Sequence, residues 1–265
     1  DALEKRKQKV FAYFKKEKNW VFYGIFALIA WFGFYIRTRN LPLLKDVTIG
    51  DFIQADPDAA AFLRYVKYIV ENGQLMSIDL MRYYPWGYEN LVDFKLLSYA
   101  IAYFYKLLHF FNSEIMVGHA HALYPPVAFV IGLIFLKRLF DYKIALLASI
   151  SLTIIPPYLF RTISGVGDKE ALGMVFFFAA LYFFVSGWKS ETLKKNLIWG
   201  ALAGLSTALM GLVWGGYAFL VSIIGLTGLI KFAFLKFKKS FLFTYILWYL
   251  SFYIMMILFR GYNFN

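Results

Sequence analysis

The sequence contains no cysteine, and only three of its 265 residues are histidine. The absence of cysteine excludes disulfide bonds, thiolate metal ligands and cysteine nucleophiles. Catalysis or metal binding must therefore use oxygen or imidazole groups, and the 16 acidic residues are the main resource. The chain also lacks internal repeats, low-complexity tracts and a glycine-rich nucleotide-binding loop.

Apolar residues are abundant instead: 61% of the chain is hydrophobic and 22% is aromatic, with a mean hydropathy of +0.59. A soluble domain is only about half apolar, so we expect an all-α polytopic membrane protein. A helix crosses a bilayer with about 20 mostly apolar residues. We predict seven spans, at residues 20–37, 117–136, 144–160, 170–187, 196–213, 216–232 and 241–259.

The positive charge of the chain follows this topology. In a soluble protein, a net charge of +12 would indicate a nucleic-acid partner. Here the basic residues gather mostly between the predicted spans, so we expect no nucleic-acid partner. The positive-inside rule puts every basic cluster in the cytoplasm only if the apolar residues 92–111 do not cross the membrane. The four clusters lie at residues 5–18, 137–143, 189–195 and 231–239.

The segment 92–111 has the pattern of an interfacial amphipathic helix, because its polar side chains recur at helical spacing on one face. These side chains are Lys95, Tyr99, Lys106 and His109. We therefore predict a multi-pass protein of the cell membrane with a cytoplasmic N-terminus. Its basic segment is residues 1–18, and its transmembrane domain is residues 19–265. The chain starts at Asp1 without methionine and stops at Asn265 after an apolar run, so we expect it to be part of a longer protein.

This topology makes residues 38–116 one long first outer loop. A loop of this length is usually functional or disordered, and its aromatic and aliphatic content indicates that it is folded. The stretch 57–71 predicts a short helix that Asn72 and Gly73 end. An aromatic turn follows at 83–88. Nine of the 16 acidic residues lie in the loop: Asp46, Asp51, Asp56, Asp58, Glu71, Asp79, Glu89, Asp93 and Glu114.

Asp168 and Glu170 lie between two apolar spans, on the outer side of the membrane in this topology. Charged residues where a span meets the membrane surface are functional candidates. Two carboxylates indicate a cation site, because Mg²⁺ or Mn²⁺ prefers carboxylate oxygen. The intervening Lys169 would then face a phosphate. The alternative is structural, because acids in the first turn of a helix complement its dipole and cap it.

Two carboxylates do not make a convincing cation site, so a further acid should come from the long loop. Asp56 and Asp58 are the candidates. Asp56 precedes Pro57, which is the pattern of a helix cap followed by the first helical residue. Asp58 would lie inside that helix, and this favours Asp58 as the ligand.

Three further features lie at the outer ends of predicted spans. Arg161 either reaches toward the interface or binds phosphate. Trp214 and Tyr217 are either interfacial aromatics or ligand contacts in a glycine-containing turn. His119 and His121 would point to different sides of a helix, so we do not expect them to share a metal.

In their order along the chain, these motifs resemble the catalytic subunit of oligosaccharyltransferase, with the archaeal AglB type the closest match. The motifs are Asp58-Ala-Ala-Ala-Phe-Leu-Arg64-Tyr65, Tyr84-Pro85-Trp86-Gly87, Pro156-Pro157 followed by Arg161-Thr-Ile-Ser-Gly-Val-Gly-Asp168-Lys169-Glu170, and Trp214-Gly-Gly-Tyr217. The resemblance extends from about residue 20 to the end of the chain.

The resemblance implies a GT-C type glycosyltransferase that moves an oligosaccharide from a polyprenyl (dolichyl) phosphate or pyrophosphate carrier to asparagine in Asn-X-Ser/Thr of an acceptor polypeptide. It implies Mn²⁺ or Mg²⁺ as cofactor and Asp58, Asp168 and Glu170 as catalytic residues and metal ligands. Lys169 departs from the asparagine or histidine that is frequent between the two acids. The resemblance also implies a donor contact for Trp214.

The chemistry of the basic residues fits such a donor. Arg64, Arg161 and Lys169 would hold its phosphate oxygens by charge-assisted hydrogen bonds. The family has further C-terminal spans and a soluble domain, which are absent from this sequence, so we expect the chain alone to be inactive. The alternatives are another polyprenyl-phosphate-sugar-dependent enzyme, such as a protein O-mannosyltransferase, and a transporter. Few charges occur in mid-span, which disfavours the transporter.

Overall fold

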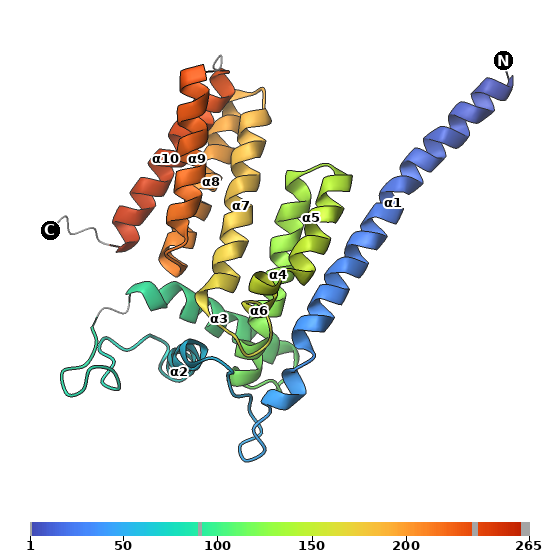
Figure 1. Cartoon of the computed structure of the whole chain (residues 1–265). Helices are drawn as coiled ribbons and strands as arrows, with labels where there is room; N and C mark the ends of the chain where they lie inside the picture. The colour runs from blue at the N-terminus through green and yellow to red at the C-terminus, as the bar shows by residue number, and fades with distance from the viewer. Residues whose placement is uncertain (1, 90–91, 235–237, 261–265) are drawn as a thin grey trace.

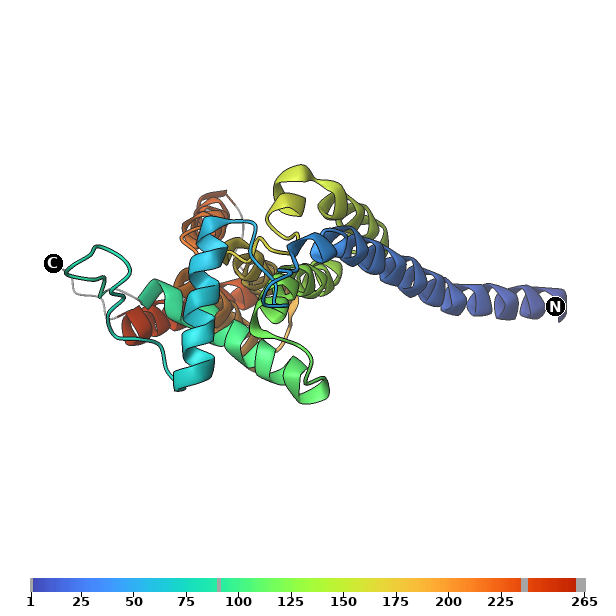
Figure 2. The same cartoon turned by 90° about the horizontal axis from the view of Figure 1, so that it is seen from below.

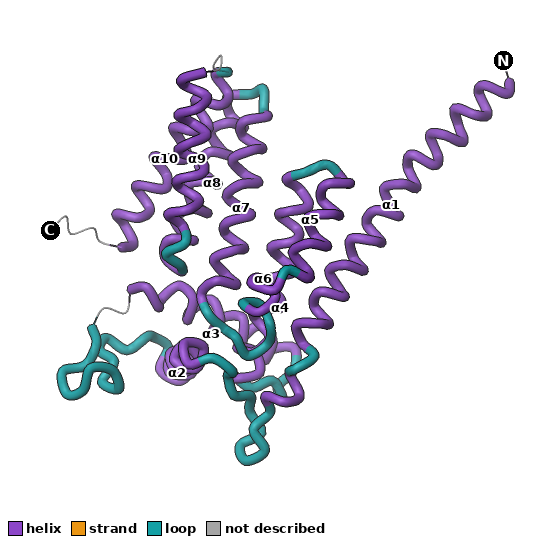
Figure 3. Tube along the Cα trace, in the orientation of Figure 1, coloured by secondary structure: helices purple, strands orange, loops and turns teal. Residues whose placement is uncertain are grey.

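The computed structural model describes residues 2–89, 92–234 and 238–260. The described residues form helices joined by loops, with only isolated bridges between Lys45 and Phe52 and between Asp79 and Tyr88. Figure 1 shows a bundle of upright helices with two helices lying across one end. Figure 3 shows that the long non-helical segments gather at that same end.

Six helices in the described residues are long and apolar enough to cross a membrane, as a membrane protein requires. They are α1 (Ala2–Thr38), α4 (Val117–Leu139), α7 (Lys169–Lys189), α8 (Leu193–Val213), α9 (Tyr217–Phe234) and α10 (Lys239–Arg260). The apolar part of the first begins at Trp20 and continues through the short 3-10 helix η1 (Leu41–Leu44).

The third predicted span, residues 144–160, is divided into two helices. α5 (Tyr142–Ile154) has only 13 residues, and α6 (Pro156–Phe160) follows after Ile155. The break occurs there because proline disfavours helical backbone in the residue before it and has no N–H to donate. The count of seven spans therefore stays a prediction, with six helices of spanning length and one shorter apolar helix.

The long loop at residues 38–116 contains the two helices that lie across the bundle. They are α2 (Pro57–Asn72) and α3 (Val92–Phe111), and Figure 2 shows them crossing one another beneath the bundle. Their apolar faces share one buried cluster, which includes Phe62, Val66, Leu97 and Ile101. This arrangement agrees with the predicted surface helix at 92–111 and with a folded outer loop.

Local sequence explains why α2 begins and ends where it does. The Asp56 carboxylate accepts hydrogen bonds from the backbone N–H groups of Asp58 (2.9 Å) and Ala59 (3.3 Å). Pro57 occupies the first helical position, where a missing N–H costs nothing. Gly73 ends the helix with φ +77°, a conformation that glycine adopts readily. The helix predicted at 57–71 is thus confirmed.

Small residues bring α8 and α10 into close contact. A methyl group added to Gly204 would lie 2.8 Å from the backbone nitrogen of Phe252 and would also overlap Ser251 and the Trp248 carbonyl. The neighbouring Thr207 accepts a 3.0 Å hydrogen bond from the Trp248 indole. The backbone of α10 cannot approach α8 this closely if residue 204 has a side chain.

We therefore expect Gly204→Ala to lower the free energy of unfolding by about 1–3 kcal/mol, the usual cost of overpacking. The matched control is Gly225→Ala in α9, where nothing lies within 4 Å of the added methyl group. The control should be neutral or slightly stabilising, because alanine favours helix over glycine. Thermal unfolding of the purified protein in detergent measures both; equal effects of the two substitutions would contradict this packing.

Candidate functional site

Two segments that are far apart in the sequence meet below the bundle. The backbone N–H of Ala55 donates a 2.9 Å hydrogen bond to the carbonyl of Gly165. Gly165 has φ +83°, and an added Cβ would overlap Leu44. Only glycine satisfies both demands at this position, so the turn before α7 can lie directly against the loop before α2.

This contact brings three carboxylates together. Oxygen atoms of Asp56, Asp58 and Asp168 all lie within 4.8 Å of one another. Asp168 is buried, Asp56 is half-buried and Asp58 is exposed. The sequence alone did not establish that the loop acids meet Asp168, and the structure does bring them together.

The three acids differ in what else they bind. Asp56 caps α2, as its position before Pro57 predicts. Asp168 is the cap residue of α7 and accepts a 2.7 Å hydrogen bond from the N–H of Lys169. Within the described part of the chain, no hydrogen bond or ion pair is recorded for the Asp58 carboxylate. Asp58 is therefore the acid whose oxygens are available to a ligand, whereas Asp56 already has a structural task.

Glu170 lies beside this group of three and is not one of its members. Arg161 lies between the acids: its Nη1 is 3.7 Å from Asp168 Oδ2 and 3.8 Å from Glu170 Oε1. The other carboxylate oxygen of Glu170 is buried without a hydrogen-bond partner. Arg161 thus partly neutralises two acids, and Glu170 keeps one unused acceptor atom.

Lys169 and Trp214, the other predicted contacts, have different surroundings. The Lys169 side chain is half-buried. Trp214 follows α8 and packs against α7, where a Cβ on Gly173 would lie 3.0 Å from its ring. Its ring also covers Gly216 in the following turn. These contacts give Trp214 a packing role, and its role as a donor contact stays a prediction.

Residues of α4 support the acidic cluster from behind. The hydroxyl of the buried Tyr124 donates a hydrogen bond to the backbone carbonyl of Asp168. One turn earlier, His121 Nδ1 lies 3.0 Å from Gln54 Oε1, and its ring leaves no room for a side chain on Gly167. His119 stacks on Phe52 at 4.4 Å and so faces another direction, as predicted.

The end of α1 holds the same turn from another side. Arg37 is fully buried and donates to Thr162 Oγ1 (2.7 Å) and to the carbonyls of Gly33, Leu152 and Thr153 (3.1–3.2 Å). Its carbonyl accepts from the Ser164 N–H at 2.8 Å. The buried charge therefore joins α1 to the segment that leads to Asp168.

The supporting roles of Tyr124 and Arg37 were not predicted from the sequence. Tyr124 offered a signal, because it follows His121 at the i, i+3 spacing that puts both on one helix face. Arg37 looked like an ordinary charge at the end of a span, and its partners other than Gly33 lie more than 100 residues away in the sequence.

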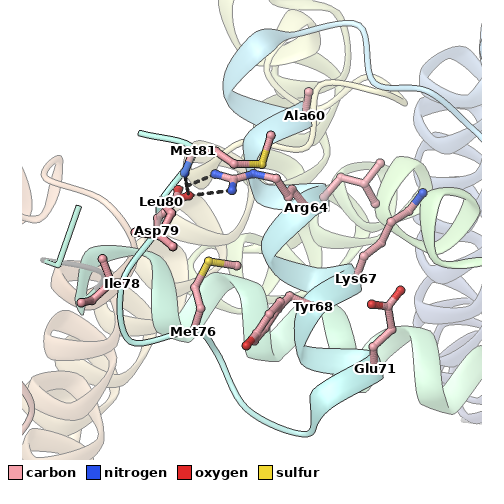
Figure 4. A pocket seen from close by; sticks show the side chains of 11 residues that line it. Ala60, Arg64, Lys67, Tyr68, Glu71, Met76, Ile78, Asp79, Leu80 and Met81 are labelled. Carbon is pink, nitrogen blue, oxygen red and sulfur yellow. Dashed lines mark hydrogen bonds and ion pairs between the residues drawn. The ribbon is translucent and has the colours of Figure 1, made fainter. Parts of the chain in front are cut away.

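Arg64, an expected phosphate contact, forms an internal ion pair, and its phosphate contact stays a prediction. The Arg64 guanidinium makes a two-pronged contact with the Asp79 carboxylate, which also accepts a 2.7 Å hydrogen bond from Tyr65. Figure 4 shows this pair in the wall of an outer groove of about 630 Å³ between α2 and residues 76–81. Arg64 therefore fastens the loop 76–88 to α2.

The hydroxyl of Tyr124 is expected to stabilise the turn before α7. Tyr124→Phe keeps the ring and leaves a buried carbonyl without its donor, which costs about 1–3 kcal/mol. Thermal unfolding in detergent should show this loss, whereas Tyr182→Phe, which has no recorded hydroxyl hydrogen bond in the described structure, should change stability by less than about 0.5 kcal/mol. Equal stability of the Tyr124→Phe variant and the parent would contradict the contact.

The Arg64–Asp79 pair predicts acid sensitivity of the loop 76–88. The guanidinium of Arg64 lowers the pKa of Asp79 from 3.8 to about 2. Because the folded pKa lies below the unfolded one, the stabilisation, about 2 kcal/mol, is complete above pH 4 and disappears as the pH falls to 2.

Hydrogen exchange, corrected for intrinsic rates, should show constant protection of residues 76–88 from pH 7 to 4 and a decline below it. Asp79→Asn should lower protection already at pH 7 and remove the decline. Asp46→Asn is the control, because Asp46 is an exposed acid whose pKa is lowered by Thr48. A decline that is the same in all three proteins would exclude Asp79 as its source.

Comparison with known proteins adds a family to this geometry. Residues 48–265 match the family model described as "Oligosaccharyl transferase STT3, N-terminal". The chain is 33% identical over 92 residues to the dolichyl-diphosphooligosaccharide–protein glycosyltransferase subunit STT3 of Dictyostelium discoideum, covering 35% of this chain and 12% of that protein. It is 30% identical over 93 residues to the dolichyl-diphosphooligosaccharide–protein glycosyltransferase subunit stt-3 of Caenorhabditis elegans. That match covers 35% of this chain and 12% of the relative.

Solved structures show the same fold. The apo oligosaccharyltransferase of Archaeoglobus fulgidus superposes with a TM-score of 0.74 at 18% identity, over 90% of this chain and 29% of that one. AglB from the same organism, in complex with an inhibitory peptide and a dolichol-phosphate, superposes with a TM-score of 0.74 at 18% identity. The match covers 91% of this chain and 30% of that one. The Archaeoglobus fulgidus enzyme in complex with Zn and sulfate superposes with a TM-score of 0.71, over 89% of this chain and 31% of that one. The chain thus spans less than a third of each of these relatives.

Proposed function

The chain belongs to the STT3 family of oligosaccharyl transferases, and we propose that its acidic cluster serves the transfer of an oligosaccharide to protein. The donor is an oligosaccharide on a polyprenyl (dolichyl) phosphate or pyrophosphate, and the acceptor is asparagine in Asn-X-Ser/Thr. The observation that carries the proposal is the meeting of Asp58 and Asp168, from segments 110 residues apart, at one end of a membrane bundle. The family match does not favour an O-mannosyltransferase or a transporter.

The solved relatives support both halves of this proposal. The structure of AglB of Archaeoglobus fulgidus has been solved in complex with a dolichol-phosphate and an inhibitory peptide, which correspond to a lipid carrier and a peptide acceptor. The same fold also occurs in a complex with Zn and sulfate. We carry these ligand classes over to this chain as substrates and as a divalent cation.

The residues present fit such a cation. Oxygens that share one Mg²⁺ at about 2.1 Å lie at most about 4.2 Å apart, so Asp58 and Asp168, which belong to the group within 4.8 Å, need only a small adjustment to share the ion. Hard divalent cations such as Mn²⁺ and Mg²⁺ prefer this donor set. Asp58 and Asp168 would hold the ion. Glu170, with its buried unpartnered oxygen, is the third ligand we propose.

A cation bound there would offset the charge on the departing phosphate. The protein's own groups would do the rest. Asp58 and Glu170 would accept hydrogen bonds from the N–H groups of the acceptor amide, a poor nucleophile that needs orientation. Attack on the anomeric carbon from the side opposite the phosphate would invert its configuration.

We propose that Arg161, Lys169 and Trp214 contact the donor. Arg161 already lies beside Asp168 and Glu170, and it is 43% exposed, so it can bind phosphate oxygen without leaving the site. Lys169 begins α7 between the two acids. Trp214 lies in the turn between α8 and α9. Its ring packs against Gly173 of α7, which follows Asp168 by five residues.

The orientation in the membrane is also a proposal. We propose a cytoplasmic N-terminus and an acidic site on the extracytoplasmic face. Figure 1 supports this, because the start of α1, the α4–α5 and α7–α8 connections, the end of α9 and the start of α10 lie at the end opposite α2 and α3. We keep residues 1–18 as the cytoplasmic segment and 19–265 as the transmembrane domain, although α1 continues without a break through this boundary.

The test is transfer of lipid-linked oligosaccharide to an Asn-X-Thr peptide by the full-length protein with Mn²⁺. We expect Asp58→Asn and Asp168→Asn to lower the rate at least 100-fold, since each removes about 3 kcal/mol of interaction with cation and amide. Asp56→Asn should retain most activity, because asparagine also caps helices. Glu191→Gln, an exposed acid at the opposite end, is the control. Unchanged transfer in Asp58→Asn and Asp168→Asn would mean that these acids are only helix caps.

A further inference from the structure

A second cavity, of about 650 Å³, lies at the end of the bundle opposite the acidic cluster. It is formed where α7 ends, near the last turn of α9 and at the start of α10. Four lysines line it together with one acid and Trp188. The lysines are Lys189, Lys231, Lys238 and Lys239, and the acid is Glu191.

The charge in this cavity is unbalanced. Four ammonium groups and one carboxylate give a local charge of +3, and the described structure records no ion pair for any of these five side chains. α10 also begins at Lys239 without an acid in its first turn. Its N-terminal dipole therefore adds positive potential instead of meeting a negative side chain. An anion bound in the cavity would relieve both unfavourable features.

Part of the cavity wall is fixed by specific contacts. The Lys231 ammonium lies 4.1 Å from the centre of the Trp188 ring, which holds the charge by a cation–π interaction. Ser240 donates a 3.1 Å hydrogen bond to the Trp188 carbonyl and so ties the start of α10 to the end of α7. Lys231 is thus held in the cavity wall, and the exposed Lys189, Lys238 and Lys239 complete the basic lining.

The position of the cavity indicates the kind of anion. Trp188 ends a membrane-spanning helix, at the level where tryptophan gathers in bilayer interfaces. The end of α9 near Lys231 exposes large apolar side chains, including Phe232 (76%) and Phe234 (81%). A ligand with a phosphate head and apolar chains matches this combination of lysines above exposed apolar residues.

We propose that this cavity binds the phosphate-bearing headgroup of an anionic membrane phospholipid. Lys231, Lys238 and Lys239 contact the phosphate, and the lipid chains lie along α9. Binding there fastens the ends of α7, α9 and α10 to one another. The site is separate from the acidic cluster, so it does not depend on the proposed transferase function.

The test measures lipid binding by the purified full-length protein with native mass spectrometry, using phosphatidylglycerol, phosphatidylcholine or inorganic phosphate as the probe. The pocket variant is Lys231→Gln/Lys238→Gln/Lys239→Gln. The charge-matched control, from the same end but outside the cavity, is Lys143→Gln/Lys194→Gln/Lys195→Gln. The corresponding Lys→Arg triple variant in the pocket keeps the charge and reports whether the fold tolerates substitution there.

We expect phosphatidylglycerol to bind more tightly than phosphatidylcholine and to lose at least about tenfold in affinity in the pocket variant. The control triple and the arginine triple should lose less than about threefold. Equal losses in the pocket and control triples would overturn the proposal in favour of diffuse attraction to basic residues. Displacement of phosphatidylglycerol by millimolar inorganic phosphate would overturn the choice of a lipid.

Discussion

Repulsion among three carboxylates is the constraint on which the site depends. Two unit charges about 4 Å apart repel by about 4 kcal/mol at an effective dielectric constant of 20, and Asp56, Asp58 and Asp168 all have oxygens within 4.8 Å of one another. Arg161 is the nearby cation recorded for Asp168, and it is shared with Glu170. The fold must therefore hold the acids together, and a bound cation would remove most of the cost.

The scaffold does this mainly through backbone groups. The Ala55–Gly165 hydrogen bond joins the two acid-bearing segments directly. Tyr124 holds the carbonyl of Asp168, and Arg37 fixes the chain before it. Because none of these contacts uses a carboxylate oxygen, they leave the carboxylate of Asp58 available. α1 and α4 thus position the acids without competing for their oxygens.

The sequence predicted features that depend on neighbouring residues. Asp56-Pro57 and Asn72-Gly73 set the ends of α2 because capping is local. The surface position of α3 followed from the distribution of lysines, which acts on the whole topology. The division of the predicted span 144–160 at Ile155 was missed, although Pro156 and Pro157 are a local signal for a helix boundary. A span of full length was expected from hydropathy alone.

Contacts between distant segments could not be predicted in this way. The ion pair of Arg64 with Asp79 competes with the predicted contact between Arg64 and a donor phosphate. Nothing in the sequence near Arg64 indicates Asp79 as its partner. Tyr124 with Asp168 and Arg37 with Thr162 likewise join separate helices. The acids of the site could be named from chemistry, but the groups that position them required the fold.

The most direct test of this account is anomalous diffraction at the manganese edge from crystals of the full-length protein grown with Mn²⁺. The account predicts a peak within coordination distance, about 2–2.5 Å, of carboxylate oxygens of both Asp58 and Asp168. The account would be contradicted if the site is fully ordered and shows no such peak. It would also be contradicted if the only manganese peak lies beside residues outside the acidic cluster.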